Sequence, residues 1–360
     1  MNSNQKISHI ITETLFDLGC RDACISPGAR NASIALSLSN RFECYNLLDE
    51  RSCAFTALGI SKFKKIPSII NCTSGTAVAN LFPAIIEARM SETPLIVITA
   101  DRPKKMIDRG ENQTIYQENI FNKYVLKYVS IDSSLSKIEE KIYLAYKSAM
   151  GQSNNQPIHE KGPVHVNVHL DEPTINNEIS AYSLKSNFKS INIRTKKNDI
   201  KINDFKKPII VCGQSNLSQD KKQIFKLSEK YNIPILSDIS SNITPHPNII
   251  YHYDLYIDKI EFDTVFRFGK KTLSKKLNAL ISKCKNTFLV RDERVFNDDT
   301  KRVLSHNQLS DFVDSSSNSL TSDWIKSIQK IENPYLSNIN SIMNETNQLN
   351  EYSAPFQVRI

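Results

Sequence analysis

Four polar clusters near the N-terminus contain side chains that can do chemistry. They read SPGAR (residues 26–30), DER (49–51), TSGT (73–76) and ADRP (100–103). A carboxylate such as that of Glu50 can take up and release a proton. The guanidinium groups of Arg30 and Arg102 can each bind a carboxylate through two hydrogen bonds. Free N–H groups in the TSGT turn can bind an anion, although a simple helix cap fits this turn equally well. These residue types point to an enzyme acting on an anionic substrate.

The four clusters need a sheet to bring them together. Each follows a short apolar run, in the order DACI, YNLL, SIIN and LIVIT. The first three clusters open onto helical patterns and the fourth onto a loop interrupted by proline. Strands that alternate with helices predict a parallel sheet covered on both faces. Ligands bind outside the carboxyl ends of the strands in such sheets, so we expect the clusters to converge at one mouth.

The length and pattern of the chain predict two α/β domains, each a doubly wound parallel sheet. The first domain is assigned to residues 1–180, and its last strand candidate lies in GPVHVNVHL. Residues 181–207 are polar and basic and are interpreted as a linker. The second domain is assigned to residues 208–350, with strands in PIIVCG, IPILSD, TVFRFG and NTFLVRD. Its first strand ends in Gly213 without a GxGxxG pattern, so no dinucleotide site is predicted.

Composition excludes several classes of protein. The net charge is +8, but the lysines are spread widely and no nucleic-acid-binding motif accompanies them, which favours a solvated surface. No apolar run approaches the ~18 residues of a membrane helix, and the N-terminus lacks the features of a signal peptide. We therefore expect a cytoplasmic protein with no membrane insertion and no nucleic-acid partner. The seven cysteines include no C-x-x-C pair, which favours reduced thiols.

Three histidines near residue 165 suggest a metal site only superficially. His165 and His169 are four residues apart on a predicted strand, and so ~13 Å apart. They cannot share one ion without a bend, and we interpret them, together with His159, as structural.

The motifs, read in order, resemble one family. SPGARN, LLDERSCAFTALGISK, NCTSGTAVANLFPAIIEA, LIVITADRP and ENQTIYQ are similar to the thiamine-diphosphate-dependent 2-succinyl-5-enolpyruvyl-6-hydroxy-3-cyclohexene-1-carboxylate synthases of menaquinone biosynthesis. An acid, a helix and TSG occur in many thiamine-diphosphate enzymes, whereas TADRP followed by NQ is much more specific. The resemblance is strong over residues 20–121 and weaker in the second domain, at FGKKTLSKKL.

The resemblance implies a three-domain architecture. Residues 1–180 would be the domain that binds the pyrimidine ring of the cofactor, and residues 208–350 a Rossmann-like central domain. The family's third domain holds the diphosphate and the metal, and its GDG signature is not found in this sequence. We therefore expect an N-terminal fragment, or one part of a split enzyme, that is inactive alone.

The resemblance also implies a reaction and partners. Enzymes of this family are transferases that decarboxylate 2-oxoglutarate on thiamine diphosphate and add the remaining unit to isochorismate. Mg²⁺ or Mn²⁺ anchors the diphosphate, so both cofactors need the third domain. Cofactor sites lie between subunits, which implies a homodimer or homotetramer.

The resemblance assigns Glu50 to catalysis and to cofactor binding, as the buried carboxyl group that shares a proton with the aminopyrimidine ring. The local pattern alone fits a second interpretation. An acid at the start of a helix stabilises the helix dipole, and either Asp49 or Glu50 can do this.

The resemblance assigns five further residues to the dicarboxylate substrates: Arg30, Arg102, Gln113, Lys275 and Lys276. Lys276 stands where the family has arginine, so the charge remains but bidentate recognition is lost. Taken singly, each arginine also fits a structural ion pair, Gln113 a solvated loop amide, and the lysines a solvated run. Functional alternatives are another thiamine-diphosphate carboligase or decarboxylase, a split-enzyme subunit, and a non-catalytic module.

Overall fold

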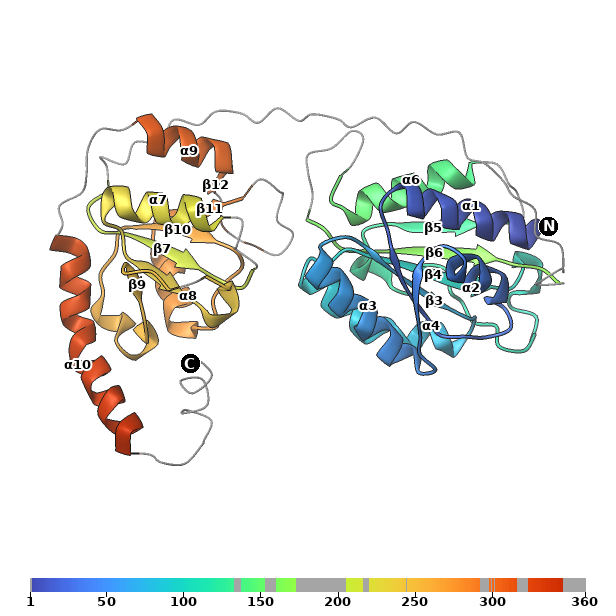
Figure 1. The fold of residues 1–360 in the computed structure, drawn as a ribbon, viewed down its shortest axis with the longest axis horizontal. Coiled ribbons are helices and arrows are strands. Elements are labelled where there is room, and N and C mark those ends of the chain that lie inside the picture. The colour runs from blue at the N-terminus through green and yellow to red at the C-terminus, as the bar shows by residue number, and fades with distance from the viewer. Residues whose placement is uncertain are drawn as a thin grey trace. The chain divides into compact units, whose positions relative to one another are not determined.

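The computed structural model describes most of both predicted domains. The described residues are 2–132, 137–152, 160–172, 205–215, 220–243, 245–291, 298, 300, 302–315 and 323–345. The chain divides into two compact units, one within residues 1–193 and the other formed by residues 194–292 and 296–360. Each unit is a sheet flanked by helices (Figure 1). Most of the predicted linker lies outside the described residues, so the domain limits stay a prediction.

The first unit is built on a parallel six-stranded sheet in the order β2-β1-β3-β4-β6-β5. Its strands are β1 (Asp22–Ile25), β2 (Glu43–Asn46), β3 (Ser68–Cys72), β4 (Leu95–Asp101), β5 (Tyr128–Ile131) and β6 (Pro163–His169). Its helices are α1 (Ser3–Asp17), α2 (Ala32–Ser39), α3 (Glu50–Lys64), α4 (Thr76–Asn80), α5 (Phe82–Met90) and α6 (Ile138–Ala149), with short 3₁₀ turns at Lys104–Met106 and Asn122–Tyr124. Helices α1, α2 and α6 pack on one face, and α3, α4 and α5 on the other (Figure 1).

Sequence features explain the central strands and the first helix. Strands β4 and β6 are buried along their whole length, as expected for strands covered on both faces. Asn2 and Gln5 form a reciprocal capping box at the start of α1. Gly19 follows the helix with φ +98°, which ends it. The edge strand β2 begins two residues before the predicted YNLL run.

The second unit contains a second parallel six-stranded sheet, in the order β12-β11-β10-β7-β8-β9. Its strands are β7 (Pro208–Cys212), β8 (Ile235–Ser237), β9 (Ile249–Ile250), β10 (Thr264–Phe268), β11 (Asn286–Val290) and β12 (Arg302–Leu304). Its helices are α7 (Lys221–Tyr231), α8 (Lys275–Lys283), α9 (His306–Ser315) and α10 (Asp323–Glu345), with 3₁₀ turns at Ile239–Ser241, Tyr253–Leu255 and Ile257–Lys259. The predicted α/β class, with two doubly wound parallel sheets, is confirmed.

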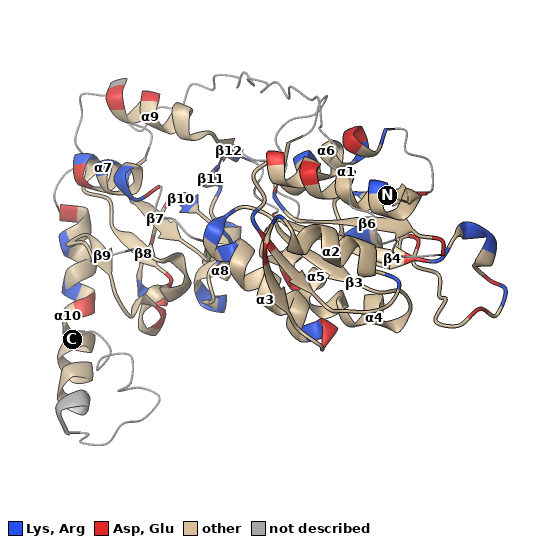
Figure 2. Cartoon of the chain, turned by 45° about the vertical axis from the view of Figure 1, so that its right-hand side comes forward, with Lys and Arg blue, Asp and Glu red and all other residues tan. Residues whose placement is uncertain are grey.

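Charged side chains are mixed on the outside of the molecule. In Figure 2, α7 and α10 each carry both basic and acidic residues. Within the described ranges, every helix falls short of the length or the apolar character that a membrane span requires.

The centre of the second sheet is closed by two loops in backbone contact. Strands β7 and β10 are neighbours at the point where the strand order reverses, where doubly wound sheets commonly hold ligands. A Cβ added at Gly213 would lie 1.7 Å from the carbonyl oxygen of Lys270. The Lys270 N–H donates to the Gln214 carbonyl oxygen at 3.1 Å. The turn after β7 is therefore used to pack one loop against another.

Replacing Gly213 with alanine should destabilise the second unit by about 2 kcal/mol or more, because backbone cannot yield to the added methyl group as a side-chain tip can. Urea unfolding can be followed by Trp324, the single tryptophan, whose Nε1–H donates to Pro208 O at 2.8 Å beside β7. Gly59→Ala in α3 is the matched control, since a methyl group added there would meet no neighbouring atom within 4 Å. An unchanged Trp324 midpoint in Gly213→Ala would show that the loops are not in contact.

Candidate functional site

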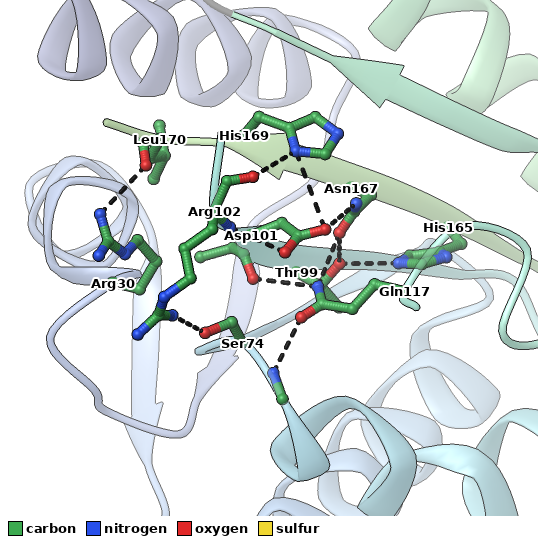
Figure 3. A network of polar contacts seen from close by, with 12 residues as sticks. Arg30, Ser74, Thr99, Asp101, Arg102, Gln117, His165, Asn167, His169 and Leu170 are labelled. Atoms are coloured by element: carbon green, nitrogen blue, oxygen red, sulfur yellow. Dashed lines mark hydrogen bonds and ion pairs between the residues drawn. The ribbon is translucent and has the colours of Figure 1, made fainter. Parts of the chain in front are cut away.

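Three of the polar clusters meet at the carboxyl ends of neighbouring strands (Figure 3). Arg30 lies between β1 and α2, Ser74 between β3 and α4, and Arg102 directly after β4. The Arg102 guanidinium group donates through Nη1 to the hydroxyl oxygen of Ser74. The Arg30 guanidinium group donates through Nη1 to the carbonyl oxygen of Leu170, just after β6, at 3.2 Å. The parallel sheet therefore brings these chain segments to one edge, as predicted.

Two guanidinium groups make this edge positive. Arg30 is buried, and its Nη2 lies 3.0 Å from Oε1 of Glu172, a largely exposed side chain. Burial lowers the pKa of Arg102 below its usual value, and the positive charge of Arg30 lowers it further. The mutual repulsion of the two arginines favours an anion placed between or beside them.

A single peptide group in the TSGT turn is held at both of its polar atoms. The Gln113 side chain donates through Nε2 to the Ser74 carbonyl oxygen at 2.9 Å. The Gly75 N–H donates to Oε1 of Gln117, also at 2.9 Å. Gly75 has φ +82°, and a Cβ there would lie 2.7 Å from Cγ of Gln113, so glycine is required. The Gly75 N–H is therefore used inside the protein and not offered to an anion.

A buried polar network lies behind this peptide (Figure 3). Gln117 donates through Nε2 to Ala100 O at 3.1 Å and to Oδ1 of Asn167 at 2.9 Å. Asn167 in turn donates through Nδ2 to Oδ2 of Asp101 at 2.8 Å. Gln117 and Asn167 were not among the site residues predicted from the sequence. Two features of the sequence could have indicated them. In PVHVNVH, valines alternate with polar residues, of which Asn167 is one, and Gln117 is the last residue of the ENQTIYQ motif.

The backbone of Arg102 is fixed on both sides by this network. Its N–H donates to Oδ1 of Asp101 at 2.8 Å, and its carbonyl oxygen accepts from Nδ1 of His169 at 2.6 Å. Burial raises the pKa of the Asp101 carboxyl group, while the hydrogen bond from Asn167 and the His169 ring, 3.8 Å away, act against that rise. The Arg102 side chain thus projects from a rigid strand end.

His165 ends the network in the core. Thr99 donates its one hydroxyl hydrogen to Oδ1 of Asn167 at 2.7 Å, so Nε2 of His165 must donate to the Thr99 oxygen, also at 2.7 Å. The aromatic rings of Phe121 and Tyr128 pack on His165. His165 and His169 therefore make separate contacts, as their spacing predicted. The described residues contain no group of three or more His, Cys, Asp or Glu side chains that could hold a metal, and His159 lies outside the described residues.

Burial lowers the pKa of His165 from 6.5 to about 3, which makes stability depend on pH. The unfolded chain binds a proton here below about pH 6.5 and the folded chain does not, so stability is lost as pH falls from 6.5 toward 3. Between pH 6.5 and 4 the loss should be about 3 kcal/mol, at 1.36 kcal/mol per pH unit. His165→Gln keeps a donor for Thr99 and cannot titrate. Urea unfolding of the first unit, followed by circular dichroism, should show a flatter pH profile in this variant; equal profiles would contradict the assignment.

Glu50 does not form the side-chain cap of α3, although it lies in the first turn of this helix, where an acid stabilises the helix dipole. Asp49 is the cap of α3, because its side chain accepts from the Ser52 N–H at 2.7 Å. Within the described residues, the hydrogen bond to the Glu50 carboxylate comes from Nδ2 of Asn80, 3.2 Å from Oε2. The side chain is half-exposed, in contrast to the buried position that the resemblance implies.

Lys275 and Lys276 lie in the second unit, at the first turn of α8. Ser274 caps this helix and donates through its hydroxyl group to Asp254, while Nζ of Lys276 lies 3.4 Å from Asp254 O. Both lysine side chains are exposed. Arg30, Arg102 and Gln113 belong to the first unit, so a shared site with these lysines stays a prediction.

Comparison with known proteins agrees with this arrangement. Residues 5–120 match the family described as thiamine pyrophosphate enzyme, N-terminal TPP binding domain, and residues 179–358 match the middle domain of thiamine pyrophosphate enzymes. Several relatives are named 2-succinyl-5-enolpyruvyl-6-hydroxy-3-cyclohexene-1-carboxylate synthase. The relative from Psychromonas ingrahamii is 31% identical over 353 residues, covering 91% of this chain and 58% of its own length. The relative from Staphylococcus haemolyticus is 35% identical over 301 residues, covering 77% of this chain and 52% of its own length.

The chain thus spans between half and three fifths of the length of these two curated relatives. The first match covers β1 to β4 and ends before β5, α6 and β6, while the second match contains all the described strands and helices of the second unit. The motifs SPGARN, DER, TSGT and ADRP all lie within the first match. The chain belongs to the thiamine pyrophosphate enzymes, and among them it is similar to the 2-succinyl-5-enolpyruvyl-6-hydroxy-3-cyclohexene-1-carboxylate synthases.

Proposed function

We propose that this chain supplies the pyrimidine-binding half of a transferase that joins 2-oxoglutarate, after decarboxylation, to isochorismate in menaquinone biosynthesis. The observation that carries the proposal is the pair of guanidinium groups, Arg30 and Arg102, at one sheet edge with Gln113 beside them. Both substrates are dicarboxylates, and guanidinium groups are the side chains best suited to bind carboxylates. The names of the relatives support the same reaction.

Glu50 acts on the cofactor in this proposal. Thiamine diphosphate, when bound, supplies the carbon nucleophile for the 2-oxo group and holds the electrons released on decarboxylation. The Glu50 carboxyl group, at the start of α3, would hold a proton at a nitrogen of the pyrimidine ring. Asn80 orients the carboxylate by binding Oε2.

Five residues are assigned to the substrate carboxylates in this proposal. Arg102 and Arg30 supply two positive charges at the strand ends, and Gln113 supplies amide groups from the loop after β4. Lys275 and Lys276 add charge from the start of α8. We assign lysine the weaker contribution, because an ammonium group is a flexible point charge without the planar fork of arginine.

The partial exposure of Glu50 supports a cofactor site at an interface between two subunits. A second subunit would cover the carboxylate with its diphosphate-binding domain and exclude water from it. In this proposal Mg²⁺ or Mn²⁺ would be held by that domain. A cytoplasmic homodimer or homotetramer is part of this proposal.

The test uses the completed enzyme, meaning this chain joined to a diphosphate-binding domain of the family. Assays with thiamine diphosphate and Mg²⁺ compare 2-oxoglutarate plus isochorismate against pyruvate as donor. We expect turnover that requires both dicarboxylates. Turnover of pyruvate without isochorismate would instead identify another thiamine-diphosphate decarboxylase or carboligase. The coding sequence downstream of Ile360 offers a second test, since a continuation that contains a GDG motif would support the proposal.

A further inference from the structure

We propose that Gln117 is a positioning residue, which fixes the Ser74–Gly75 peptide so that Arg102 and Gln113 face a dicarboxylate. The nature of the ligand rests on the function proposed above, whereas the positioning itself rests on contacts within the first unit.

Gln117 and Gln113 form hydrogen bonds with the two polar atoms of one peptide group. Gln113 Nε2 donates to its carbonyl oxygen, that of Ser74, and Gln117 Oε1 accepts from its N–H, that of Gly75, each at 2.9 Å. The two glutamines differ in burial, because Gln117 is 1% exposed and Gln113 lies at the surface. Gln117 therefore cannot touch substrate from its buried position, while Gln113 is accessible to it.

The orientation of the Gln117 amide is fixed by its other contacts. Its Nε2 faces two acceptors, the carbonyl oxygen of Ala100 and Oδ1 of Asn167. Oδ1 of Asn167 also accepts from Thr99, and Nδ2 of Asn167 donates to Asp101, so the Asn167 amide cannot flip either. Oε1 of Gln117 is thus the only atom of this amide that can point at Gly75.

The contacts form a closed ring that includes the substrate arginine. From Gln117 the ring runs through the Ser74–Gly75 peptide to the Arg102 guanidinium group, which donates to the Ser74 hydroxyl group. It returns from the Arg102 N–H to Asp101, then to Asn167 and back to Gln117. Both the side chain and the backbone of Arg102 are therefore held through Gln117.

Gln117→Glu turns this ring into a pH-sensitive one. A protonated glutamic acid keeps an acceptor for Gly75 and one donor for Asn167 or Ala100. An ionised one places negative charge against two acceptor oxygens, near Asp101. Burial and that neighbouring carboxylate raise the pKa of the new side chain above its ordinary value of about 4.3. The hydrogen bonds of the ring should therefore remain at pH 5 and break as the pH rises through the raised pKa of the new side chain.

Two readouts on the 360-residue chain test the proposal. One is exchange of the Gly75 amide hydrogen, measured by NMR and corrected for intrinsic pH dependence. The other is binding of 2-oxoglutarate and of succinate, measured by NMR titration. In Gln117→Glu we expect nearly wild-type behaviour at pH 5, and by pH 8 about tenfold faster Gly75 exchange with about tenfold weaker binding, the size of one lost hydrogen bond. The wild-type chain should not show this dependence.

Two control variants separate positioning from general damage. Gln223→Glu makes the same change in the second unit, where Gln223 donates to Ser310 and to His306 O, and should leave both readouts unchanged. Ser74→Ala removes the hydroxyl partner of Arg102 and leaves the side-chain contacts of Gln117 in place. It should weaken dicarboxylate binding severalfold while Gly75 stays protected, and it keeps the proposal testable if Gln117→Glu does not fold.

The outcomes are distinct. If the corrected exchange rate of the Gly75 amide hydrogen in Gln117→Glu does not change with pH, the positioning role is wrong. Loosened Gly75 with unchanged dicarboxylate binding, or normal binding in Ser74→Ala, would overturn the link to Arg102. A wild-type chain that binds no dicarboxylate would contradict the proposed substrate class. In that case, pH-dependent exchange of the Gly75 amide hydrogen in Gln117→Glu would still support the positioning of the Ser74–Gly75 peptide by Gln117.

Discussion

Replacing Glu50 with glutamine should lower turnover of the completed enzyme by about 10²–10⁴-fold, the range typical of a lost proton-transfer group. Glutamine keeps the size of the side chain and can still accept from Asn80, the hydrogen-bond donor 3.2 Å away. It cannot share a proton with a ring nitrogen. The measurement is exchange of the cofactor's thiazolium hydrogen by NMR, together with steady-state rates, and both should fall together.

The adjacent acid provides the matched control. Asp49 accepts from the Ser52 N–H and caps α3. Asparagine caps helices about as well as aspartate, so Asp49→Asn should retain both stability and turnover. Its pKa is held below the usual value mainly by the Ser52 N–H, so the replaced charge is a structural one. Normal exchange in Glu50→Gln, or an equal loss in Asp49→Asn, would return Glu50 to a role in helix stability.

The convergence of the clusters was predictable because it depends on local patterns and one topological rule. Short apolar runs gave β1, β3 and β4 to within two residues, and the carboxyl ends of neighbouring parallel strands must share an edge. Edge strand β2 was displaced by two residues because it is mostly exposed and carries no apolar pattern. The predicted sheet alone placed Arg30 and Arg102 close to each other, without any knowledge of side-chain contacts.

The buried network was not predictable in the same way. Gln117 and Asn167 are 50 positions apart, and neither has a local pattern that names the other as its partner. Whether a buried amide accepts from Gly75 or from elsewhere depends on the register of β4 against β6, which pairs Thr99 with Asn167. The exposure of Glu50 also escaped prediction, because a resemblance to whole enzymes describes an assembled site, whereas one unit leaves that carboxylate half-open.

Arg102→Ala should raise the KM of the completed enzyme for a dicarboxylate by tenfold or more, with little change in cofactor affinity. One lost charged hydrogen bond costs about 1.5–3 kcal/mol, and 1.4 kcal/mol corresponds to a factor of ten. Arg102 is well suited to this measurement, because its side chain binds the neutral Ser74 hydroxyl group. Steady-state kinetics with 2-oxoglutarate and isochorismate varied separately identify which substrate is affected.

Arg30 requires a different design because its guanidinium group already has a carboxylate partner. Nη2 of Arg30 lies 3.0 Å from Glu172, and Nη1 donates to Leu170 O, so Arg30→Ala would also loosen the segment after β6. Glu172→Gln removes the competing charge and leaves Arg30 in place. The Glu172 side chain is 76% exposed, so its pairing is weak and its removal should cost little stability. We expect Glu172→Gln to lower the dicarboxylate KM severalfold, opposite in sign to Arg102→Ala. A raised KM in Glu172→Gln, or weakened cofactor binding with normal KM in Arg102→Ala, would show that these arginines serve the cofactor and not the substrate.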